Sequence, residues 1–378
     1  MKIYYIANAH MPTVKAHGIQ LAKMCEAFVD CGANLELILP NTKRELYGMG
    51  EFYGLKQNIK QKYLPVFRGG AGRVGFLLSA VSFSVSCFIY MLLEKFRGNV
   101  NLIYTIDLDH FSFLSVPFLR IPYFVEVHGL KKTTFFHSFF FNQAKGMVAT
   151  NSFIKDYLVR SYGVDKDKIL VQPNGIDFEK FSSSFSKEDA RKKLGISSDK
   201  SIALYSGRFY GWKGLGILME AAKILENVSF YLVGGLKEDL TKILSYENFP
   251  SNVVFAGHKD YKEMPQWLAA ADVLLVLGTS KNSDSYFYTS PMKIFEYMAS
   301  RRPIVASRTP ANAEIATSNE AFFYTPDDTG DFVSQIRSAL RNQAAAEKKA
   351  FAACQKAKSL DWRERAKNIL SFMEYNVK

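Results

Sequence analysis

Residues 202–225 read IALYSGRFYGWKGLGILMEAAKIL, and they contain a strand, a loop and a helix in direct succession. The apolar run Ile202 to Ser206 predicts a buried strand. Glycines interrupt the loop that follows, and Gly214 to Leu225 repeats apolar residues at the spacing of a helix. A strand that leads through such a loop into a helix is the building unit of a parallel sheet covered by helices.

The same alternation extends in both directions along the chain. Towards the C-terminus we predict strands at Ser229–Val233, Val253–Ala256, Val273–Leu277, Pro303–Ala306 and Ala321–Tyr324, and helices at Met264–Ala270, Pro291–Ser300 and Gly330–Asn342. Towards the N-terminus we predict strands at Ile3–Ala7, Leu35–Leu39, Leu102–Thr105, Tyr123–Val127 and Met147–Ala149, with a helix at Gly18–Val29. The chain is therefore expected to be an α/β protein with parallel sheets.

A turn-rich stretch, Gln172-Pro173-Asn174-Gly175, separates the two runs of alternation. A chain of 378 residues with 48% apolar residues also exceeds what one hydrophobic core usually supports. We therefore predict a Rossmann-like domain at residues 1–172, a second at residues 173–360, and an amphipathic helix within residues 361–378 that packs back towards the first. Two such sheets are expected to bind ligands in a cleft at the carboxyl ends of their strands.

The formal charge of +12 narrows the class of partner. A positive field attracts nucleic acid, anionic membrane surfaces and phosphorylated small molecules. The Lys and Arg residues are scattered and accompany no nucleic-acid-binding motif, so no nucleic-acid partner is expected. The four cysteines form no CxxC pair or Cys/His cluster, and the N-terminus reads as a strand rather than an apolar leader, so we expect a cytoplasmic protein.

The segment Val74 to Leu93 is an unbroken run of uncharged residues that is long enough to span a bilayer. Its serines and Gly75 make a membrane-spanning helix less favourable. A helix buried between a sheet and its neighbours has the same composition and is the preferred interpretation. Docking on a membrane surface and a true span are the alternatives.

Two cations lie five residues apart in the loop after the strand at Ile202 to Ser206. Arg208 follows Gly207, and Lys213 precedes the next predicted helix. A guanidinium and an ammonium beside a helix N-terminus can bind a diphosphate, together with free main-chain N–H groups and the helix dipole. A basic surface turn is the alternative interpretation, because such residue pairs are common.

The stretch TSPMKIFEYMA at 289–299 predicts a second part of the site. Ser290 is a suitable N-cap and Pro291 suits the first helical position, so the helix is expected to begin at Ser290. Lys293 and Glu296 are three residues apart and share one face of that helix. A carboxylate there can accept hydrogen bonds from a ribose diol, whereas an exposed salt bridge between the two is the alternative.

Together with further motifs, these segments resemble the family 4 (group 1) retaining glycosyltransferases of the GT-B fold. The further motifs are the turn Asn174-Gly175-Ile176-Asp177 with Phe181, the sequence Val233-Gly234-Gly235, and the sequence Val254-Phe255-Ala256-Gly257-His258. The order and spacing match from about Asn174 to Pro326, and the match is weaker but continuous through the N-terminal half.

The resemblance implies two Rossmann-like domains facing each other across a cleft, with the acceptor on the N-terminal domain and the nucleotide-sugar on the C-terminal one. It implies that Arg208 and Lys213 neutralise the diphosphate and that Glu296 binds the ribose. The other implied donor-binding residues are Gly18, Gly207, Gly234, His258, Ser290, Pro291, Met292 and Lys293. No metal or other cofactor is implied, because the cations replace the divalent ion of other glycosyltransferases.

The sugar end of the implied site departs from the family pattern. The family has a glutamate that contacts the transferred sugar at the position of Tyr288, and Asp284 in the preceding serine-rich loop is a candidate replacement. From the N-terminal half, the match at Val125–Gly129 implies that His128 contacts the sugar or backs the reaction centre. Gly18 corresponds to the family's glycine-rich first loop, which lacks one glycine here.

These residues imply transfer of a hexose from a UDP- or GDP-sugar to a saccharide or lipid-linked acceptor, with retention, in bacterial-type cell-surface polysaccharide or glycoconjugate synthesis. The aromatic run Phe135–Phe141, together with Val74 to Leu93, is compatible with peripheral contact at the inner face of the membrane through the N-terminal domain. A nucleotide-sugar-binding protein without transferase activity and a GT-B nucleotide-sugar epimerase are the alternatives.

Overall fold

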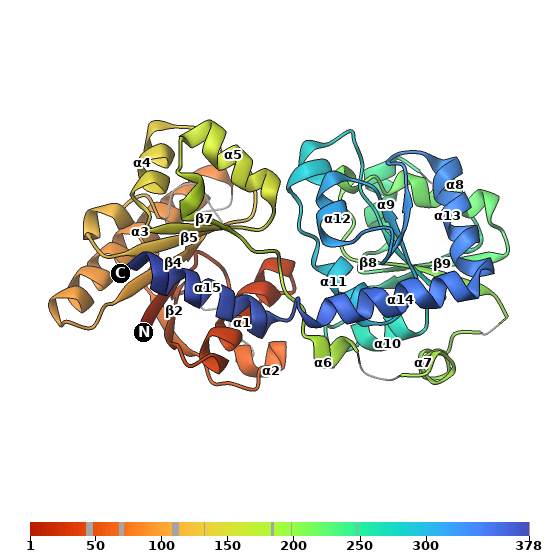
Figure 1. Ribbon diagram of the computed structural model, residues 1–378, viewed down its shortest axis with the longest axis horizontal. Helices are drawn as coiled ribbons and strands as arrows, with labels where there is room; N and C mark the ends of the chain where they lie inside the picture. Colours follow the sequence, from red (N-terminus) through yellow and green to blue (C-terminus); the bar gives the residue numbers. More distant parts are fainter. Residues whose placement is uncertain are drawn as a thin grey trace. The chain divides into compact units, whose positions relative to one another are not determined.

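A computed structural model describes residues 1–42, 48–67, 72–107, 113–131, 133–182, 185–197, 199–246 and 248–377. The chain folds into two compact units (Figure 1). Unit 1 comprises Met1–Pro173 and Trp362–Lys378, and unit 2 comprises Asn174–Asp361. The chain thus leaves unit 1 after Pro173 and returns to it for its last helix, drawn in dark blue in Figure 1.

Unit 1 is built on a seven-stranded parallel sheet in the order β3-β2-β1-β4-β5-β6-β7. Its strands are β1 (Lys2–Ile6), β2 (Asn34–Pro40), β3 (Lys60–Leu64), β4 (Leu102–Ile106), β5 (Tyr123–Val127), β6 (Gly146–Ala149) and β7 (Ile169–Val171). Its helices are α1 (Ala16–Asp30), α2 (Met49–Tyr53), α3 (Arg73–Phe96), η1 (Val116–Leu119), α4 (Phe135–Gln143), α5 (Ser152–Tyr162), η2 (Lys166–Lys168) and α15 (Trp362–Val377). The strands β3 and β7 escaped prediction because β3 is polar and β7 is very short, as edge strands often are.

Unit 2 is built on a six-stranded parallel sheet in the order β10-β9-β8-β11-β12-β13. Its strands are β8 (Ser201–Ser206), β9 (Val228–Val233), β10 (Val253–Gly257), β11 (Val273–Val276), β12 (Ile304–Ser307) and β13 (Phe322–Tyr324). Its helices are α6 (Phe178–Phe181), α7 (Lys187–Leu194), η3 (Gly211–Lys213), α8 (Gly216–Ile224), α9 (Lys237–Leu244), α10 (Met264–Ala269), η4 (Asp284–Tyr288), α11 (Met292–Ala299), α12 (Pro310–Ile315), α13 (Thr329–Arg341) and α14 (Gln343–Lys358). The predicted α/β class with parallel sheets is confirmed for both halves of the chain.

Each sheet has one point at which the strand order reverses. In unit 1 this point lies between β1 and β4, and in unit 2 it lies between β8 and β11. The loops at the carboxyl ends of two such strands run in opposite directions, which leaves a crevice that open α/β sheets use to bind ligands. In unit 2 these loops contain the cations and the start of α11 that the sequence singled out.

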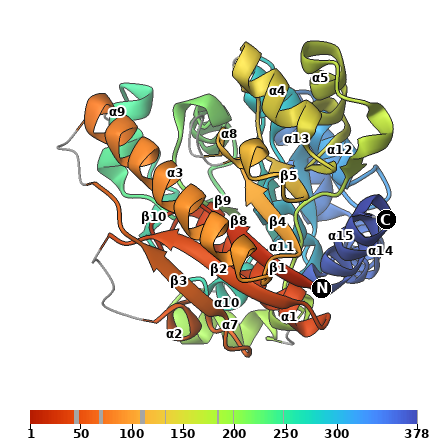
Figure 2. The same cartoon turned by 90° about the vertical axis from the view of Figure 1, so that its left-hand side faces the viewer.

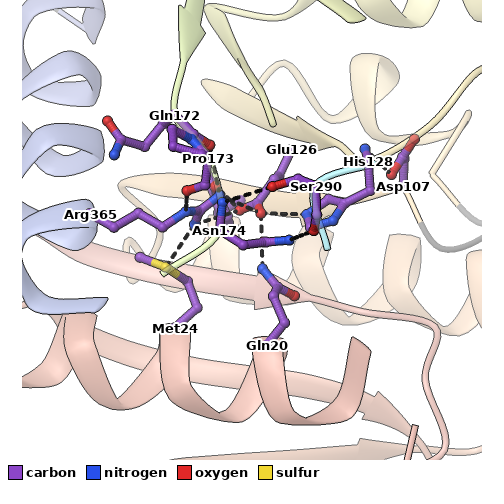
Figure 3. A network of polar contacts seen from close by, with 11 residues as sticks. Gln20, Met24, Asp107, Glu126, His128, Gln172, Pro173, Asn174, Ser290 and Arg365 are labelled. Atoms are coloured by element: carbon purple, nitrogen blue, oxygen red, sulfur yellow. Dashed lines mark hydrogen bonds and ion pairs between the residues drawn. The ribbon is translucent and has the colours of Figure 1, made fainter. Parts of the chain in front are cut away.

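The predicted start of α11 at Ser290 is wrong. The helix begins at Met292, Pro291 is its N-cap, and no side chain caps it. Ser290 is held instead by Asn174, whose Nδ2 donates to the Ser290 carbonyl oxygen at 2.9 Å and whose main-chain N lies 3.4 Å from Ser290 Oγ (Figure 3). A partner more than a hundred residues away, not local capping preference, decides where this helix begins.

The preferred interpretation of Val74 to Leu93 as a buried helix is also wrong. The segment forms most of α3, but only 22% of its apolar window is buried. Phe83 and Met91 are completely buried on one side of the helix, whereas Val85 and Ile89 on the other side are 53% and 54% exposed. The helix is long and apolar enough to cross a membrane by length and composition. The hydrophobic periodicity of the sequence could not predict which side of the helix is exposed, because both sides are apolar.

Candidate functional site

Glycines allow the strand ends of unit 2 to approach one another at the point of order reversal. Gly207, Gly234 and Gly257 follow or end β8, β9 and β10, and their φ angles are +122°, +117° and +73°, values that favour glycine. A Cβ atom on Gly234 would lie 2.8 Å from the carbonyl carbon of Gly207, which is shorter than any normal contact. Main chain therefore packs on main chain here, and the N–H groups of Gly207 and Gly234 donate to the carbonyl oxygens of Val233 and Gly257 at 2.7 Å and 2.8 Å.

Three cationic side chains belong to the loop after β8 and to the first turn of α11. A Cβ atom on Gly207 would lie 2.9 Å from Lys293 Nζ, and that Nζ lies 3.7 Å from the centre of the Tyr205 ring. Lys213 Nζ lies 5.1 Å and 5.2 Å from the Tyr210 and Trp212 rings. Arg208 directly follows Gly207, so it emerges from the same turn.

The two lysines are held in surroundings that disfavour their charge. Burial lowers the pKa of Lys213 to about 8. Burial, followed by repulsion from Lys213, lowers the pKa of Lys293 well below its usual value, although Glu296 opposes this shift. A bound anion would restore the charged form of both, so the cluster is better matched to an anionic ligand than to an empty site.

Glu296 is a buried carboxylate in the middle of α11. It is 8% exposed, and neither a hydrogen bond nor an ion pair to its carboxylate occurs among the described residues. Burial raises its pKa to about 7, although Lys293 and Lys180 oppose the shift. The alternative of an exposed salt bridge with Lys293 is therefore wrong. Its carboxylate oxygens are not among the fully buried polar atoms without a partner, so they remain open to a ligand hydroxyl that could donate to them.

Glu296→Gln is expected to make the free protein more stable at pH 8 and to leave its stability nearly unchanged at pH 5. The folded-state pKa of about 7 lies above the unfolded value. Burial of the ionised carboxylate therefore lowers the free energy of unfolding fully above pH 7, and this loss disappears at low pH. We expect a gain of about 2 kcal/mol at pH 8, measured as a higher melting temperature. The matched control is exposed Glu238→Gln. If Glu296→Gln lost the same stability at both pH values, Glu296 would not be a buried carboxylate with a raised pKa.

Tyr297 connects the two halves of the unit 2 site, and no motif in the sequence predicts this role. Its hydroxyl accepts from the Ser206 main-chain N at 2.8 Å and donates to Ser206 Oγ at 3.0 Å. This side chain fastens α11 to the end of β8 and so fixes Lys293 beside Gly207. Ser206 and Tyr297 are 91 positions apart, and no spacing in the sequence indicates such a pair.

The remaining predicted residues of unit 2 lie around this centre. Asp284 and Tyr288 begin and end the turn η4, which packs against η3 and therefore lies beside the turn of Lys213. His258 is exposed directly after β10. Ser290, Pro291 and Met292 form the entry to α11. Among the described residues, no group of three or more His, Cys, Asp or Glu side chains could hold a metal ion.

In unit 1, His128 directly follows β5 and is held by two acidic residues (Figure 3). Its Nε2 lies 2.5 Å from Glu126 Oε1, and its main-chain N donates to Asp107 Oδ1 at 2.9 Å. The side chain of His128 is 26% exposed, whereas that of Glu126 is completely buried. Burial raises the pKa of Asp107, opposed by Lys131 and His128. The sequence predicted His128 but not the two acids that orient it.

Glu126 is the centre of a polar network to which the C-terminal helix contributes. Arg365 of α15 donates to it from Nη2 at 2.8 Å, Gln20 of α1 from Nε2 at 2.9 Å, and Tyr104 of β4 from its hydroxyl at 2.5 Å. Burial alone would raise the pKa of Glu126, but Arg365 and His128 outweigh burial and hold it well below its usual range. Figure 3 shows Arg365 and Gln20 reaching Glu126 from two different helices.

Gly18 has a packing role that the sequence analysis did not foresee. A Cβ atom there would lie 2.4 Å from Thr13 Cγ2 and 2.6 Å from the Tyr53 hydroxyl. The Gly18 N–H donates to the Lys15 carbonyl oxygen at 2.9 Å and closes the first turn of α1, whose N-cap is Lys15. Glycine is thus required at this position for the close approach of Thr13 and Tyr53.

Comparisons with known proteins match both units. A family model described as "Glycosyltransferase Family 4" matches residues 20–180, and one described as "Glycosyl transferases group 1" matches residues 186–358. The chain is 27% identical to a sulfoquinovosyl transferase of Arabidopsis thaliana over 54% of this chain and 40% of that protein. It is 27% identical to an alpha-galactosylglucosyldiacylglycerol synthase of Streptococcus pneumoniae over 50% of this chain and 49% of that protein. The matches thus span about half, or less, of these relatives' lengths.

Solved structures share the fold at low sequence identity. A sucrose-phosphate synthase of Thermosynechococcus elongatus has a TM-score of 0.78 at 17% identity, covering 99% of this chain and 98% of that one. The Anabaena protein HepE, solved in complex with UDP-glucose, has a TM-score of 0.73 at 18% identity, covering 99% of this chain and 100% of that one. Both likenesses support the GT-B fold class.

Proposed function

Since this chain belongs to the group 1 glycosyltransferases, with family models matching residues 20–180 and 186–358, we propose that it transfers a hexose from a UDP- or GDP-sugar to a saccharide or lipid-linked acceptor. One observation carries the proposal above the others. Glu296 is largely buried in α11, the charge of Lys293 acts on it, and no donor to its carboxylate occurs in the part of the chain that the structure describes. The ribose diol of a nucleoside diphosphate can donate hydrogen bonds to this carboxylate, and its diphosphate can bind the neighbouring cations.

Each part of the donor is assigned to its own residues in unit 2. Arg208, Lys213 and Lys293 neutralise the diphosphate, and Glu296 accepts hydrogen bonds from the ribose hydroxyls. Gly207 and Gly234 let the main chain approach the phosphates. The remaining donor-lining residues are His258, Ser290, Pro291 and Met292. The nucleotide-sugar is a substrate, and the cations supply the charge that a metal ion supplies elsewhere, so no cofactor is expected.

The chemistry assigned to these residues is mainly support of the leaving group. The bond between the anomeric carbon and the diphosphate oxygen breaks, the acceptor oxygen attacks from the same face, and its proton passes to the departing phosphate. Retention follows from that geometry. We assign to Arg208 and Lys213 the stabilisation of the charge that grows on the diphosphate, which is where preorganised cations lower a barrier most.

Unit 1 is assigned the acceptor and a part of the sugar's surroundings. His128, oriented by Glu126 and Asp107, contacts the sugar or backs the reaction centre. Gly18 shapes the loop that leads into α1. At the sugar end of unit 2, Asp284 and Tyr288 are the candidate contacts. One relative is named alpha-galactosylglucosyldiacylglycerol synthase, which supports a lipid-linked acceptor. We further propose a cytoplasmic enzyme that is peripheral at the inner face of the membrane.

A nucleotide-sugar-binding protein without transferase activity is the second candidate function. One observation favours it, namely Tyr288 in the place of the glutamate that the family uses at the sugar. The two functions differ in turnover. Release of the nucleoside diphosphate from its sugar in the presence of a lipid and oligosaccharide extract supports the transferase, and tight binding without any release supports the second candidate.

A panel of UDP, GDP and ADP in the presence of a chelator is expected to yield one nucleotide that stabilises the protein. At a concentration a hundredfold above its dissociation constant, the nucleotide should add about 2.7 kcal/mol to the free energy of unfolding, measured as a rise in melting temperature. Adenosine without phosphates is the control, because it lacks the anion that the lysines bind. A panel without any response would rule out the donor site.

A further inference from the structure

The exposed side of α3 is an apolar stripe that runs along the whole helix. Its members follow the i, i+3, i+4 spacing of one helix face. They are Val74, Leu77, Leu78, Val81, Val85, Ile89, Leu93 and Phe96, each between 42% and 81% exposed. Large exposed apolar patches on a soluble protein mark an interaction site. We call this face the α3 stripe.

The opposite side of α3 belongs to the core of unit 1. Ala80, Phe83, Cys87 and Met91 are each at most 4% exposed. Three serines also fasten the helix: Ser82 Oγ accepts from the Phe67 N at 2.8 Å, Ser84 Oγ lies 2.9 Å from Ser115 Oγ, and Ser86 donates to the Pro65 carbonyl at 2.7 Å. A helix that crossed a bilayer would lose all of these contacts, so α3 stays on the unit. Figure 2 shows it lying across the front of the sheet.

Aromatic side chains extend the stripe beyond α3. Phe118 of η1 is 67% exposed and its ring centre lies 5.7 Å from that of Phe139 in α4. Phe135 and Phe136 at the start of α4 are 79% and 65% exposed. Because η1 packs against both α3 and α4, these rings lie on the same side of unit 1 as the end of α3. The surface is too broad to be explained by a few isolated exposed residues.

The charge of the protein is concentrated in the unit that carries the stripe. Unit 1 has 24 Lys and Arg against 14 Asp and Glu residues, a formal +10, whereas unit 2 has 24 against 22, a formal +2. At the C-terminal end of α3, Lys95 and Arg97 are exposed. Lys62 of the neighbouring strand β3 lies 5.5 Å from the Tyr90 ring of α3. The one acid of α3, Glu94, is buried and bonded to Tyr4, Arg97 and Asn99.

We infer that the α3 stripe docks unit 1 on an anionic lipid bilayer, with α3 lying in the interface and not spanning it. Apolar side chains that protrude from a helix enter the acyl boundary, and cations at its margin bind anionic headgroups. A second copy of this chain is less well matched, because two copies of unit 1, each with a formal charge of +10, would repel each other. The inference rests on the proposed location at the inner face of the membrane and deepens it, because it names the surface that makes the contact; lipid binding itself requires no donor or acceptor.

Flotation of the full chain with vesicles tests this docking. The protein should bind vesicles of mixed phosphatidylcholine and phosphatidylglycerol, bind less to phosphatidylcholine alone, and dissociate as salt is raised. The triple variant Val81→Gln, Val85→Gln, Ile89→Gln should lower the partition coefficient by about tenfold or more, because each change withdraws apolar area from the lipid. Glutamine is a good helix former, so α3 should persist.

Ile224→Gln is the matched control, since Ile224 is 50% exposed on α8 of unit 2. It should bind vesicles as the unchanged protein does. Helical circular dichroism and the melting-temperature response to nucleotide should be the same in all three proteins, which separates a failure of docking from a failure of the donor site. Absence of vesicle binding, equal binding by the triple variant, or a lipid-free dimer that the triple variant abolishes would each overturn the inference.

Discussion

Lys213→Ala is expected to lower the turnover number by about a thousandfold. A preorganised charge aimed at a leaving group contributes a factor of this order when it is removed. The change should leave the fold intact or make it more stable, because burial holds the pKa of Lys213 at about 8 and the variant loses that cost. Release of nucleoside diphosphate from the donor that the nucleotide panel identifies is the rate to measure, beside the melting temperature of each protein.

Two further substitutions sharpen this test. Lys223→Ala removes an exposed lysine from α8 of the same unit and should leave the rate unchanged. Arg208→Ala should resemble Lys213→Ala, because both cations are assigned to the diphosphate. A Lys213→Ala protein that keeps its melting temperature and also its rate would exclude Lys213 from the donor site.

Arg365→Ala is expected to destabilise unit 1 by about 4 kcal/mol at neutral pH. Removing one partner of a buried ion pair leaves the other charge without compensation, and here that charge is on Glu126, whose side chain is 0% exposed. Arg365 also donates from Nε to the Pro173 carbonyl oxygen at 2.7 Å, so the end of the first chain segment loses a donor as well. Thermal unfolding followed between pH 4.5 and pH 8 measures the loss.

The pH dependence of this loss identifies its cause. In the unchanged protein Arg365 and His128 hold the pKa of Glu126 well below its usual range, so the carboxylate contributes stability above its unfolded-state pKa and loses it as pH falls. Without Arg365, burial raises the pKa of Glu126, and protonation relieves the unpaired charge at low pH. The difference between variant and unchanged protein should therefore shrink as pH falls.

Substitutions at neighbouring positions serve as controls for Arg365. Arg363→Ala removes an exposed arginine from the same helix and should have little effect on stability. The double variant Glu126→Gln, Arg365→Met should recover much of the loss, because it contains no isolated buried charge. If Arg365→Ala and Arg363→Ala unfold at the same temperature, the network does not hold α15 in place.

Where a segment has the hydrophobic period of one type of element, the sequence alone predicted that element, although it did not predict where α11 begins. The apolar run Ile202 to Ser206, followed by a glycine-containing loop and a helical pattern, predicted a β-loop-α unit. Strand β8 occupies the predicted residues and one more at its start. Strand β5 has the predicted bounds, Tyr123–Val127. Residue type and spacing alone left Arg208 and Lys213 as a possible basic turn, and only the order of motifs that resembles the family assigned them and Glu296 to a donor site, so their roles stay predictions.

Only the tertiary structure determined which residues far apart in the sequence contact each other. Tyr297 reaches Ser206, and Arg365 reaches Glu126 across 239 positions, because strands and helices far apart in the chain are brought together by the sheet order. In the same way, α3 has an apolar sequence on both faces, and the fold covers one face and leaves the other exposed. Periodicity specifies what an element is, whereas long-range packing specifies which of its faces is covered and which charges are paired.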